Sequence, residues 1–556
     1  MNIRQAFQLA VQHHQSGRLA EAEVAYRRIL AAEPRHAEAL QLLGVIAHQM
    51  GHNAPAVDLI RQAIAIKPRF PEAHYNLGVF LSALGQPDEA LEAYRGAIAL
   101  KPDYPEAHYN LGCILDGKGR TDEAIAAYRE TIALKPDHAQ ACINLGSALQ
   151  HSGLWDEAIA AYRQAIALNP NLSEAHCNLG TVLKDKGQTD EAIATYHRAI
   201  QLKPDDPEVR NNLGNALKDK GLVEEAIAAY RQAIALTPDF ADAHWNLSLS
   251  LLLQGNFLPG WEKYEWRWRT RDFIAVRRNF TQPQWDGGPL EGRTILVYAE
   301  QGFGDVLHFI RYLPLIARRG ARVIVECQES LRRLVQTMSP ELTVVAMGHP
   351  LPPFDAHCPL LSLPGLFATD LASIPRDVPY LHADAAEAGM WRDRLADRSA
   401  SLKVGLVWAG SPAFKADLLR SPRRLSLYAP LGGVEGVEFF SLQKGEAARQ
   451  AGTPPLGMTL HDWTDDLRDF ADTAALMENL DLIISSDTSV VHLAGALGKP
   501  VWVLLPFAPD WRWLLDRSDS PWYPTMRLFR QRRALEWEPV IAQVREELQS
   551  LVASRD

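Results

Sequence analysis

One period of 34 residues runs through the first half of this 556-residue chain. A proline keeps that interval at Pro34, Pro68, Pro102, Pro136, Pro170, Pro204 and Pro238, and a glycine keeps it from Gly17 to Gly255. An alanine recurs at the same spacing, and in all but one of these periods a tyrosine follows it four residues later. Apolar residues lie at helical spacing on either side of each glycine, so each period predicts two helices joined by a glycine turn. A single helix pair cannot bury its own apolar face, and the pairs must therefore stack.

This pattern resembles the tetratricopeptide repeat. The resemblance implies an all-α superhelix with a concave groove that receives a protein or a peptide. We expect seven repeats ending near Pro238 and an eighth that decays, in which Ser248 replaces a recurrent glycine and the second helix reads PGWEKYEWRWR. An aromatic and basic last repeat is expected where an array docks onto another domain. The predicted repeat solenoid spans residues 1–272.

An asparagine column is the one feature of the repeats that suggests a binding role. Its members precede a leucine on the first helix of successive repeats: Asn76, Asn110, Asn144, Asn178, Asn212 and Asn246. An amide offers both a donor and an acceptor, which suits the backbone of an extended peptide. The arrangement resembles the asparagine ladder of O-linked N-acetylglucosamine transferases. The alternative is that these amides only bond to neighbouring helices.

The pattern changes at about residue 245. All tryptophans except Trp155 lie from Trp245 onward, and residues 273–290 have no period and are predicted to form a connector. Short apolar runs then alternate with amphipathic stretches, which predicts parallel sheets. The expected strands are 294–300, 322–327, 342–347, 403–410, 437–442, 480–485 and 500–505. They divide into two α/β halves, 291–390 and 400–556, and ligands of such sheets lie at the carboxyl ends of the strands.

The segment AEQGFGDVLHF, residues 299–309, passes from a predicted strand through a glycine turn into a helix. Gly302 and Gly304 allow the backbone to approach a ligand, and Asp305 lies where a helix cap is expected. The GDVLH sequence resembles the first-strand loop of lipopolysaccharide heptosyltransferases. That resemblance implies that Asp305 is the base that activates the acceptor hydroxyl; the alternative is a capping role.

The segment SSDTSVVHLAGALGKP, residues 485–500, follows another predicted strand. Asp487, Thr488 or Ser489 can cap the helix, whose unpaired N–H groups make a site for pyrophosphate. His492 lies one turn further along and can donate to a phosphate. This stretch resembles the donor-nucleotide motif of the same enzymes, which implies that these four residues bind the donor. Alternatively, His492 packs on the sheet.

Two further segments carry candidate donor contacts. The heptosyltransferase resemblance implies a cation near residues 407–427, for which Arg420 is the nearest match, with Lys415 and Arg424 as rivals. In FFSLQKGEAARQ, residues 439–450, Lys444 is expected near the base and ribose, beside Gln443 and Glu446.

Composition excludes several other functions. The net charge of −10 gives no electrostatic footprint for nucleic acid. The sequence contains no run of 18 apolar residues, so no membrane span is expected. Its first residues do not resemble a secretory signal, and a cytoplasmic protein is therefore expected. The five cysteines are scattered, so neither a disulfide framework nor a zinc site is expected. The sequence contains no Asp-x-Asp pair, so no metal site of that type is expected.

Together these patterns predict a multidomain chain: a tetratricopeptide superhelix followed by an α/β region. The resemblance to heptosyltransferases implies a GT-B fold of two Rossmann-like halves, with the acceptor on the first and the nucleotide sugar on the second. It also implies inverting, metal-independent glycosyl transfer with a nucleotide-diphosphate sugar as co-substrate and no other cofactor. A protein acceptor follows from the layout alone. The alternative function is a non-catalytic interaction scaffold whose α/β region is degenerate or senses sugar nucleotides.

Overall fold

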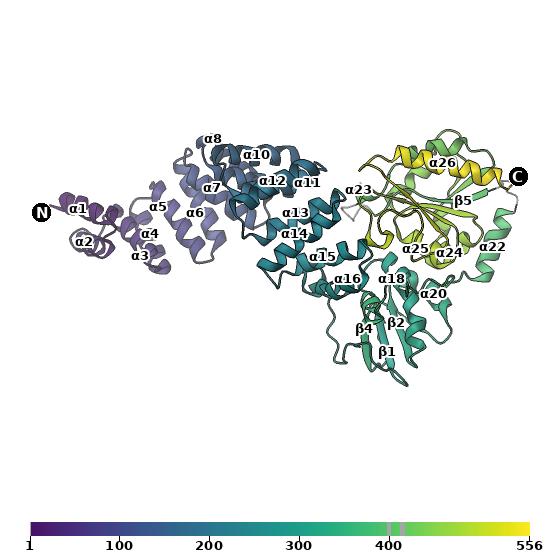
Figure 1. Ribbon diagram of the computed structural model, residues 1–556. Helices are drawn as coiled ribbons and strands as arrows, with labels where there is room; N and C mark the ends of the chain where they lie inside the picture. The colour runs from purple at the N-terminus through teal and green to yellow at the C-terminus, as the bar shows by residue number, and fades with distance from the viewer. Residues whose placement is uncertain (1, 397–401, 412–416, 556) are drawn as a thin grey trace. The chain divides into compact units, whose positions relative to one another are not determined.

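The computed structural model describes residues 2–396, 402–411 and 417–555 of the chain. The chain forms two compact units, residues 1–209 and 210–556, each of which is described by itself. Figure 1 shows helices alone through the first part of the sequence and two sheets in the second. The boundary between the units lies inside the repeats rather than at their end.

The first unit contains six pairs of helices. Their first helices are α1 (Ile3–Gln15), α3 (Ala37–Gln49), α5 (Pro71–Ala83), α7 (Pro105–Gly117), α9 (Ala139–His151) and α11 (Ser173–Asp185). Their second helices are α2 (Leu19–Ala32), α4 (Asn53–Ile66), α6 (Pro87–Leu100), α8 (Thr121–Leu134), α10 (Trp155–Leu168) and α12 (Thr189–Leu202). A seventh helix pair is α13 (Pro207–Asp219) and α14 (Val223–Leu236).

The recurrent residues have the roles that their spacing predicts. The turn glycines from Gly17 to Gly255 all have a positive φ, between 70° and 82°, which disfavours any residue with a Cβ. A second glycine column gives room to the tyrosine of the same repeat, since a Cβ on Gly146 would lie 2.7 Å from the Tyr162 ring. The tyrosine itself is fully buried. The predicted helix pairs are therefore confirmed.

The eighth repeat belongs to the second unit and packs against the α/β region. It consists of α15 (Ala241–Leu253), α16 (Phe257–Tyr264) and the 3₁₀ turn η1 (Glu265–Arg269), which the short helix α17 (Arg271–Ile274) follows. Trp261 donates to the carbonyl of Thr369 at 2.9 Å, and its ring lies 5.2 Å from that of Trp511. The aromatic residues of this repeat thus form the contact that the sequence predicts.

The first sheet has the strand order β3-β2-β1-β4, with every pair parallel. Its strands are β1 (Thr294–Tyr298), β2 (Arg322–Cys327), β3 (Thr343–Ala346) and β4 (Ala356–Pro359). The helices between and after them are α18 (Phe303–Phe309), α19 (Leu313–Ala317), α20 (Glu329–Val335) and α21 (Leu363–Leu366). Gly302 precedes α18 as its N-cap, and Gly304 and Asp305 lie in its first turn.

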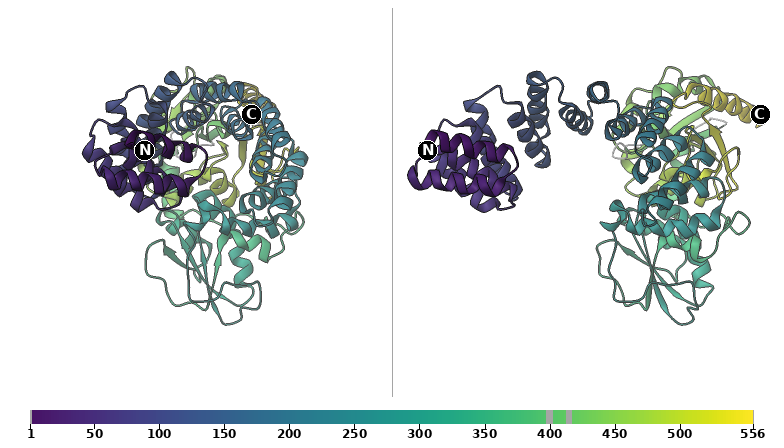
Figure 2. Two further views of the ribbon diagram at one scale, coloured as in Figure 1. Left: turned by 90° about the vertical axis from the view of Figure 1, so that its left-hand side faces the viewer. Right: turned by 60° about the vertical axis from the view of Figure 1, so that its left-hand side comes forward.

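The second sheet has the order β10-β9-β8-β5-β6-β7 and is parallel throughout. Its strands are β5 (Leu402–Val407), β6 (Val437–Ser441), β7 (Leu460–His461), β8 (Leu482–Ser486), β9 (Val501–Leu505) and β10 (Met526–Arg530). Its helices are α22 (Ala385–Leu395), α23 (Asp417–Arg420), α24 (Phe470–Glu478), α25 (Ser489–Ala496) and α26 (Glu538–Ala553). Figure 2 shows both sheets with helices packed on them.

The fold class is confirmed: helical repeats are followed by an α/β region with parallel sheets. All seven expected strands are present, and β4, β7 and β10 are additional. The core of the second sheet is apolar, with Leu406, Trp408 and Ile484 fully buried or nearly so. Within the described residues, no helix is both long enough and apolar enough to cross a bilayer.

Candidate functional site

A cavity of about 580 Å³ lies where the carboxyl ends of strands from both sheets meet. The first turn of α18 contributes Phe303 and Gly304, and the segments after β5, β6 and β8 contribute most of the remaining wall. Five of the predicted donor contacts line it: Arg420, Lys444, Asp487, Thr488 and Ser489. The cavity is thus placed where ligands of parallel α/β sheets usually bind.

The start of α25 forms one wall of this cavity. Of the three residues that can cap the helix, Thr488 does so: its side chain accepts a 3.3 Å hydrogen bond from the N–H of Val490. Ser489 and Val490 form the first turn and also line the cavity. A helix N-terminus carries partial positive charge, so this wall favours an anion.

Asp487 and Arg420 form an ion pair in the wall of the cavity. Asp487 is nearly inaccessible, whereas 28% of the Arg420 side chain is exposed. The charge of Asp487 raises the pKa of Arg420, so the guanidinium stays protonated. Among the rival cations, Arg424 is exposed and lines a different hollow, and Lys415 lies outside the described residues.

Lys444 lines the cavity, but its ammonium group bonds to the backbone. Its Nζ donates to the carbonyls of Thr464, at 2.5 Å, and Leu467, at 2.9 Å. The neighbouring Gln443 braces the loop after β5, because its Oε1 accepts from the N–H groups of Trp408 and Ala409. A role of Lys444 in donor binding remains a prediction.

Asp305 lies in the first turn of α18 and bonds to a residue far away in the sequence. Nη2 of Arg512 donates to its carboxylate at 2.5 Å, and Nη1 of the same side chain donates to Asp510 at 2.9 Å. Burial raises the pKa of Asp305 above its usual value, while the charge of Arg512 opposes the shift. The carboxylate is therefore a stronger base than one in water, held in place by an arginine.

His492 packs against Gly304 of α18 and does not line the cavity. Its side chain is buried, and a Cβ on Gly304 would lie 3.1 Å from its ring, so Gly304 is needed for α18 to approach α25. Gly302, in contrast, would meet only the side chain of Asp305 at 3.7 Å. This position agrees with the packing alternative for His492; direct donation to a phosphate stays a prediction.

The hydroxyl of one tyrosine lies between two buried histidines, one on α18 and one on α25. The hydroxyl of Tyr523 lies 3.1 Å from Nδ1 of His492 and 3.2 Å from Nδ1 of His308. The hydroxyl has one proton and also lies 3.4 Å from the hydroxyl of Tyr380, so it donates to at most one of the two nitrogens. Burial lowers the pKa of both histidines well below the usual value, which favours neutral rings.

Sequence reasoning did not find Arg512, Asp510 or Tyr523. All three lie after β9 in a segment that matches no motif, and Arg512 lies 207 residues from Asp305. The only local signal is a pair of charges in PDWRWLL, inside an otherwise apolar run. In the described part of the chain, no group of His, Cys, Asp and Glu side chains is arranged to hold a metal ion.

The asparagine column makes contacts between successive repeats. Nδ2 of Asn144 donates to the Tyr109 hydroxyl at 3.3 Å, and Asn110 donates to Tyr75 at 3.2 Å. Asn246 donates to Asn211 at 3.0 Å. All six members of the column are partly buried. Nδ2 of Asn144 also donates to the sulfur of Cys113 at 3.6 Å, and both the structural and the peptide-binding interpretations remain open.

Comparison with known proteins identifies the repeats. Models of the tetratricopeptide repeat, described as "TPR repeat" or "Tetratricopeptide repeat", match residues 13–77, 81–115, 109–173, 161–194, 180–221 and 214–255. A curated relative, Protein FlbA of Caulobacter vibrioides, is 28% identical over 329 residues, which cover 55% of this chain. The chain spans about half the length of that relative, namely 54%.

Solved structures of repeat proteins are similar to part of the chain. The crystal structure of MamA is 30% identical, with a TM-score of 0.28, and covers 29% of this chain and 94% of its own. That of YrrB, described as a TPR protein with an unusual peptide-binding site, is 23% identical, with a TM-score of 0.31; it covers 33% of this chain and 95% of its own. The family models establish that tetratricopeptide repeats extend between residues 13 and 255 of this chain.

Proposed function

We propose that this chain is a glycosyltransferase that moves a sugar from a nucleotide-diphosphate donor to an acceptor, which is a protein held by the repeats. The observation that carries the proposal is the cavity at the carboxyl ends of both sheets. Its walls include the start of α25, the charged residue Arg420, and Phe303 and Gly304, which directly precede Asp305 in α18. The resemblance of GDVLH and DTSVVHLAGALGKP to heptosyltransferases supports the same assignment.

The donor diphosphate belongs at the start of α25 in this proposal. The N–H groups of the first turn and the helix dipole attract an anion, and the guanidinium of Arg420, paired with Asp487, lies in the same wall and can donate to it. Together they stabilise the negative charge that develops on the leaving diphosphate. Asp487 holds Arg420 in the wall of the cavity through their ion pair.

Asp305 is the general base of the proposed reaction. Its carboxylate takes the proton of the acceptor hydroxyl while the hydroxyl oxygen forms a bond to the anomeric carbon of the sugar. The bond from that carbon to the diphosphate breaks, and the diphosphate leaves with the electron pair, so the configuration inverts. Arg512 keeps Asp305 ionised and oriented, and burial strengthens it as a base.

A protein-interaction scaffold is the second candidate, and the repeats favour it, because stacked helix pairs offer extended binding surfaces. In that case the α/β region is degenerate or only senses sugar nucleotides. The two candidates differ in whether the chain converts a nucleotide sugar to products: the glycosyltransferase does, and the scaffold does not.

Ligand-induced stabilisation of the full chain tests the proposal. The chain is heated with nucleoside diphosphates and their sugars while tryptophan fluorescence is followed, since nearly all tryptophans lie in the second unit. A ligand at about 100 times its Kd stabilises the folded state by about 2.7 kcal/mol. Arg420→Ala should reduce the shift, whereas Arg424→Ala, a change outside the cavity, should preserve it. If no nucleotide raises the Tm, the proposal is wrong.

A further inference from the structure

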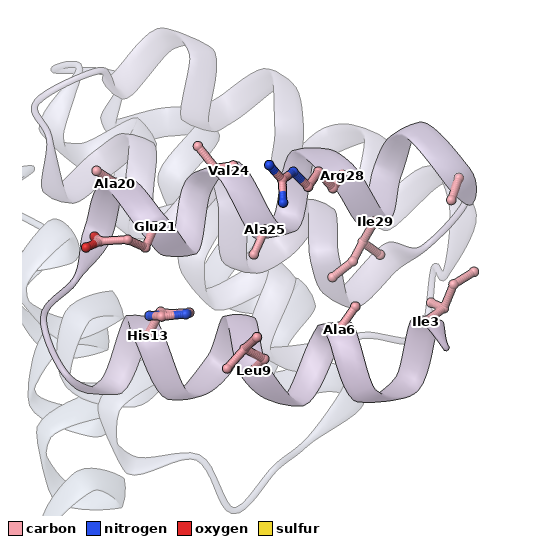
Figure 3. Close-up of a pocket in the computed structure, with 11 residues that line it drawn as sticks. Ile3, Ala6, Leu9, His13, Ala20, Glu21, Val24, Ala25, Arg28 and Ile29 are labelled. Carbon is pink, nitrogen blue, oxygen red and sulfur yellow. The ribbon is translucent and has the colours of Figure 1, made fainter. Parts of the chain in front are cut away.

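The first repeat exposes an apolar groove between α1 and α2. The groove encloses about 600 Å³, and Figure 3 shows its side chains along the two antiparallel helices. Ile3, Leu9 and Val24 line it with 37%, 40% and 49% of their surfaces exposed. In the second repeat, the counterparts of Ile3 and Leu9 are Ala37 and Leu43, which are only 4% and 3% exposed. The first repeat thus presents to solvent the apolar positions that are buried in the next repeat.

The apolar residues that α2 contributes to the groove do not occupy the helix positions that are buried in the internal repeats. Val24 stands where the next two repeats have Asp58 and Glu92, both exposed. One position earlier, the internal repeats have buried residues such as Val57 and Leu91, whereas α2 has Glu23. The apolar positions of α2 are therefore shifted by one residue relative to those of the internal repeats, so the α2 side of the groove differs from the surface on which a repeat stacks.

Two unpaired charges flank Val24 on α2. Glu21 and Arg28 both line the groove and are exposed, and neither has a hydrogen bond or an ion pair with any residue that the structure describes. Elsewhere in the array, the counterparts of Glu21 do have partners: Arg61 pairs with Glu89, and Arg129 pairs with Glu157. Within the described residues, no arginine has that role for Glu21.

A two-fold arrangement of two copies can pair these charges with each other. Glu21 and Arg28 lie three and a half residues on either side of the point between Val24 and Ala25. A two-fold axis through that point makes two copies of α2 antiparallel, with Val24 against Ala25 and Glu21 against Arg28 of the partner subunit. An interface on a two-fold axis uses the same patch on both copies, so both ion pairs form at once.

The neighbouring side chains allow this approach. Ala20, Ala25 and Ala32 are small, which leaves room for a second helix over the groove. Burial of the exposed parts of Ile3, Leu9 and Val24 then supplies the apolar free energy of association. We infer that the groove between α1 and α2 is the interface of a homodimer, in which four helices, two from each copy, pack around a two-fold axis.

Sedimentation velocity of the full chain at about 1–100 µM tests this inference. The expected result is a concentration-dependent species with twice the 61.9 kDa mass of the chain. Val24→Asp should raise the dimer Kd about tenfold or more, because it buries an unpaired charge. Asp58 shows that this helix position accepts aspartate, so the variant should fold, as circular dichroism checks. Ala126→Asp makes the same change at the exposed counterpart in the fourth repeat and should leave the dimer intact.

Charge exchange tests the proposed pairing directly. Glu21→Arg alone and Arg28→Glu alone should each weaken the dimer, because each variant opposes like charges across the axis. The double variant, which exchanges the two charges, should restore the wild-type Kd to within about threefold. A monomer at every concentration, an unchanged Kd in Val24→Asp, or a double variant as weak as the single ones would each overturn the inference.

Discussion

The guanidinium of Arg267, in the last repeat, donates a 2.9 Å hydrogen bond to the carboxylate of Glu300, which follows β1. Both side chains are fully inaccessible to solvent. Arg267 also donates to Ser362 at 2.8 Å, so one side chain joins the repeat to two segments of the first α/β half. Glu300 lies only five residues before Asp305. The repeat therefore supports the strand and loop that position the candidate base.

Removal of Arg267 should destabilise the second unit. Arg267→Met leaves Glu300 buried without its partner, and the loss of one member of a buried ion pair costs about 3–5 kcal/mol. The expected result is a lower Tm in a thermal melt followed by tryptophan fluorescence. An exposed pair of the same unit provides the control: Arg533→Met breaks the contact with Glu536, where the side chains are 80% and 49% exposed, and should cost less than about 1 kcal/mol. Equal effects of the two variants would contradict the structural role of Arg267.

The asparagine column should divide into residues that hold the repeats together and residues that do not. Asn144 bonds to Tyr109, so Asn144→Ala should lower the free energy of unfolding by about 1 kcal/mol. Asn178 has no hydrogen-bond partner among the described residues, and Asn178→Ala should leave stability unchanged. Circular dichroism of the helical melt measures both. If Asn178→Ala weakens retention of a protein acceptor while stability is unchanged, the peptide-binding interpretation gains support; equal losses of stability would favour a purely structural column.

The pH dependence of turnover should report on Asp305. A general base acts when it is ionised, so kcat/KM should rise as the pH increases through the pKa of Asp305. Burial raises this pKa, and the rise should therefore occur at a higher pH than for an exposed aspartate. Arg512→Gln removes the opposing charge and should move the rise to still higher pH, whereas Arg512→Lys, which keeps the charge, should move it less. If Arg512→Gln and the wild type have the same pH profile, the ionisation of Asp305 does not control the rate, and the assignment of Asp305 as the base is contradicted.

The repeats could be predicted from the sequence because their determinants are local. Glycine turns, the alanine and the tyrosine lie within one repeat, and each contacts its own helix pair or the next one. The seven expected strands are predicted from largely apolar runs of six to eight residues. In contrast, β7 has two residues, β4 reads AHCP, and β10 contains two arginines in MRLFR, so none shows an apolar run of that kind.

The candidate site could be predicted only in part. The resemblances identified residues on the walls of one cavity, since the loop after β1 and the start of α25 are each defined by a short motif. Residues that contact these motifs from distant parts of the sequence carry no such motif. Arg512 contacts Asp305, and Tyr523 contacts His492, only because the chain folds back after β9. The same lack of local information explains why Arg420 and Asp487, 67 residues apart, were not recognised as an ion pair.

The central claim concerns the carboxylate of Asp305, and nucleoside diphosphate release by the wild-type chain and by Asp305→Asn tests it most directly. The full chain is incubated with nucleotide-diphosphate sugars, alone and with a candidate protein acceptor, and the released diphosphate is measured. The account predicts release by the wild type and a rate about 10²–10⁴ lower in Asp305→Asn, with the donor-induced shift in Tm retained. Release at the wild-type rate in Asp305→Asn would contradict the assignment of the base, and no release from any donor by the wild type would contradict glycosyl transfer itself.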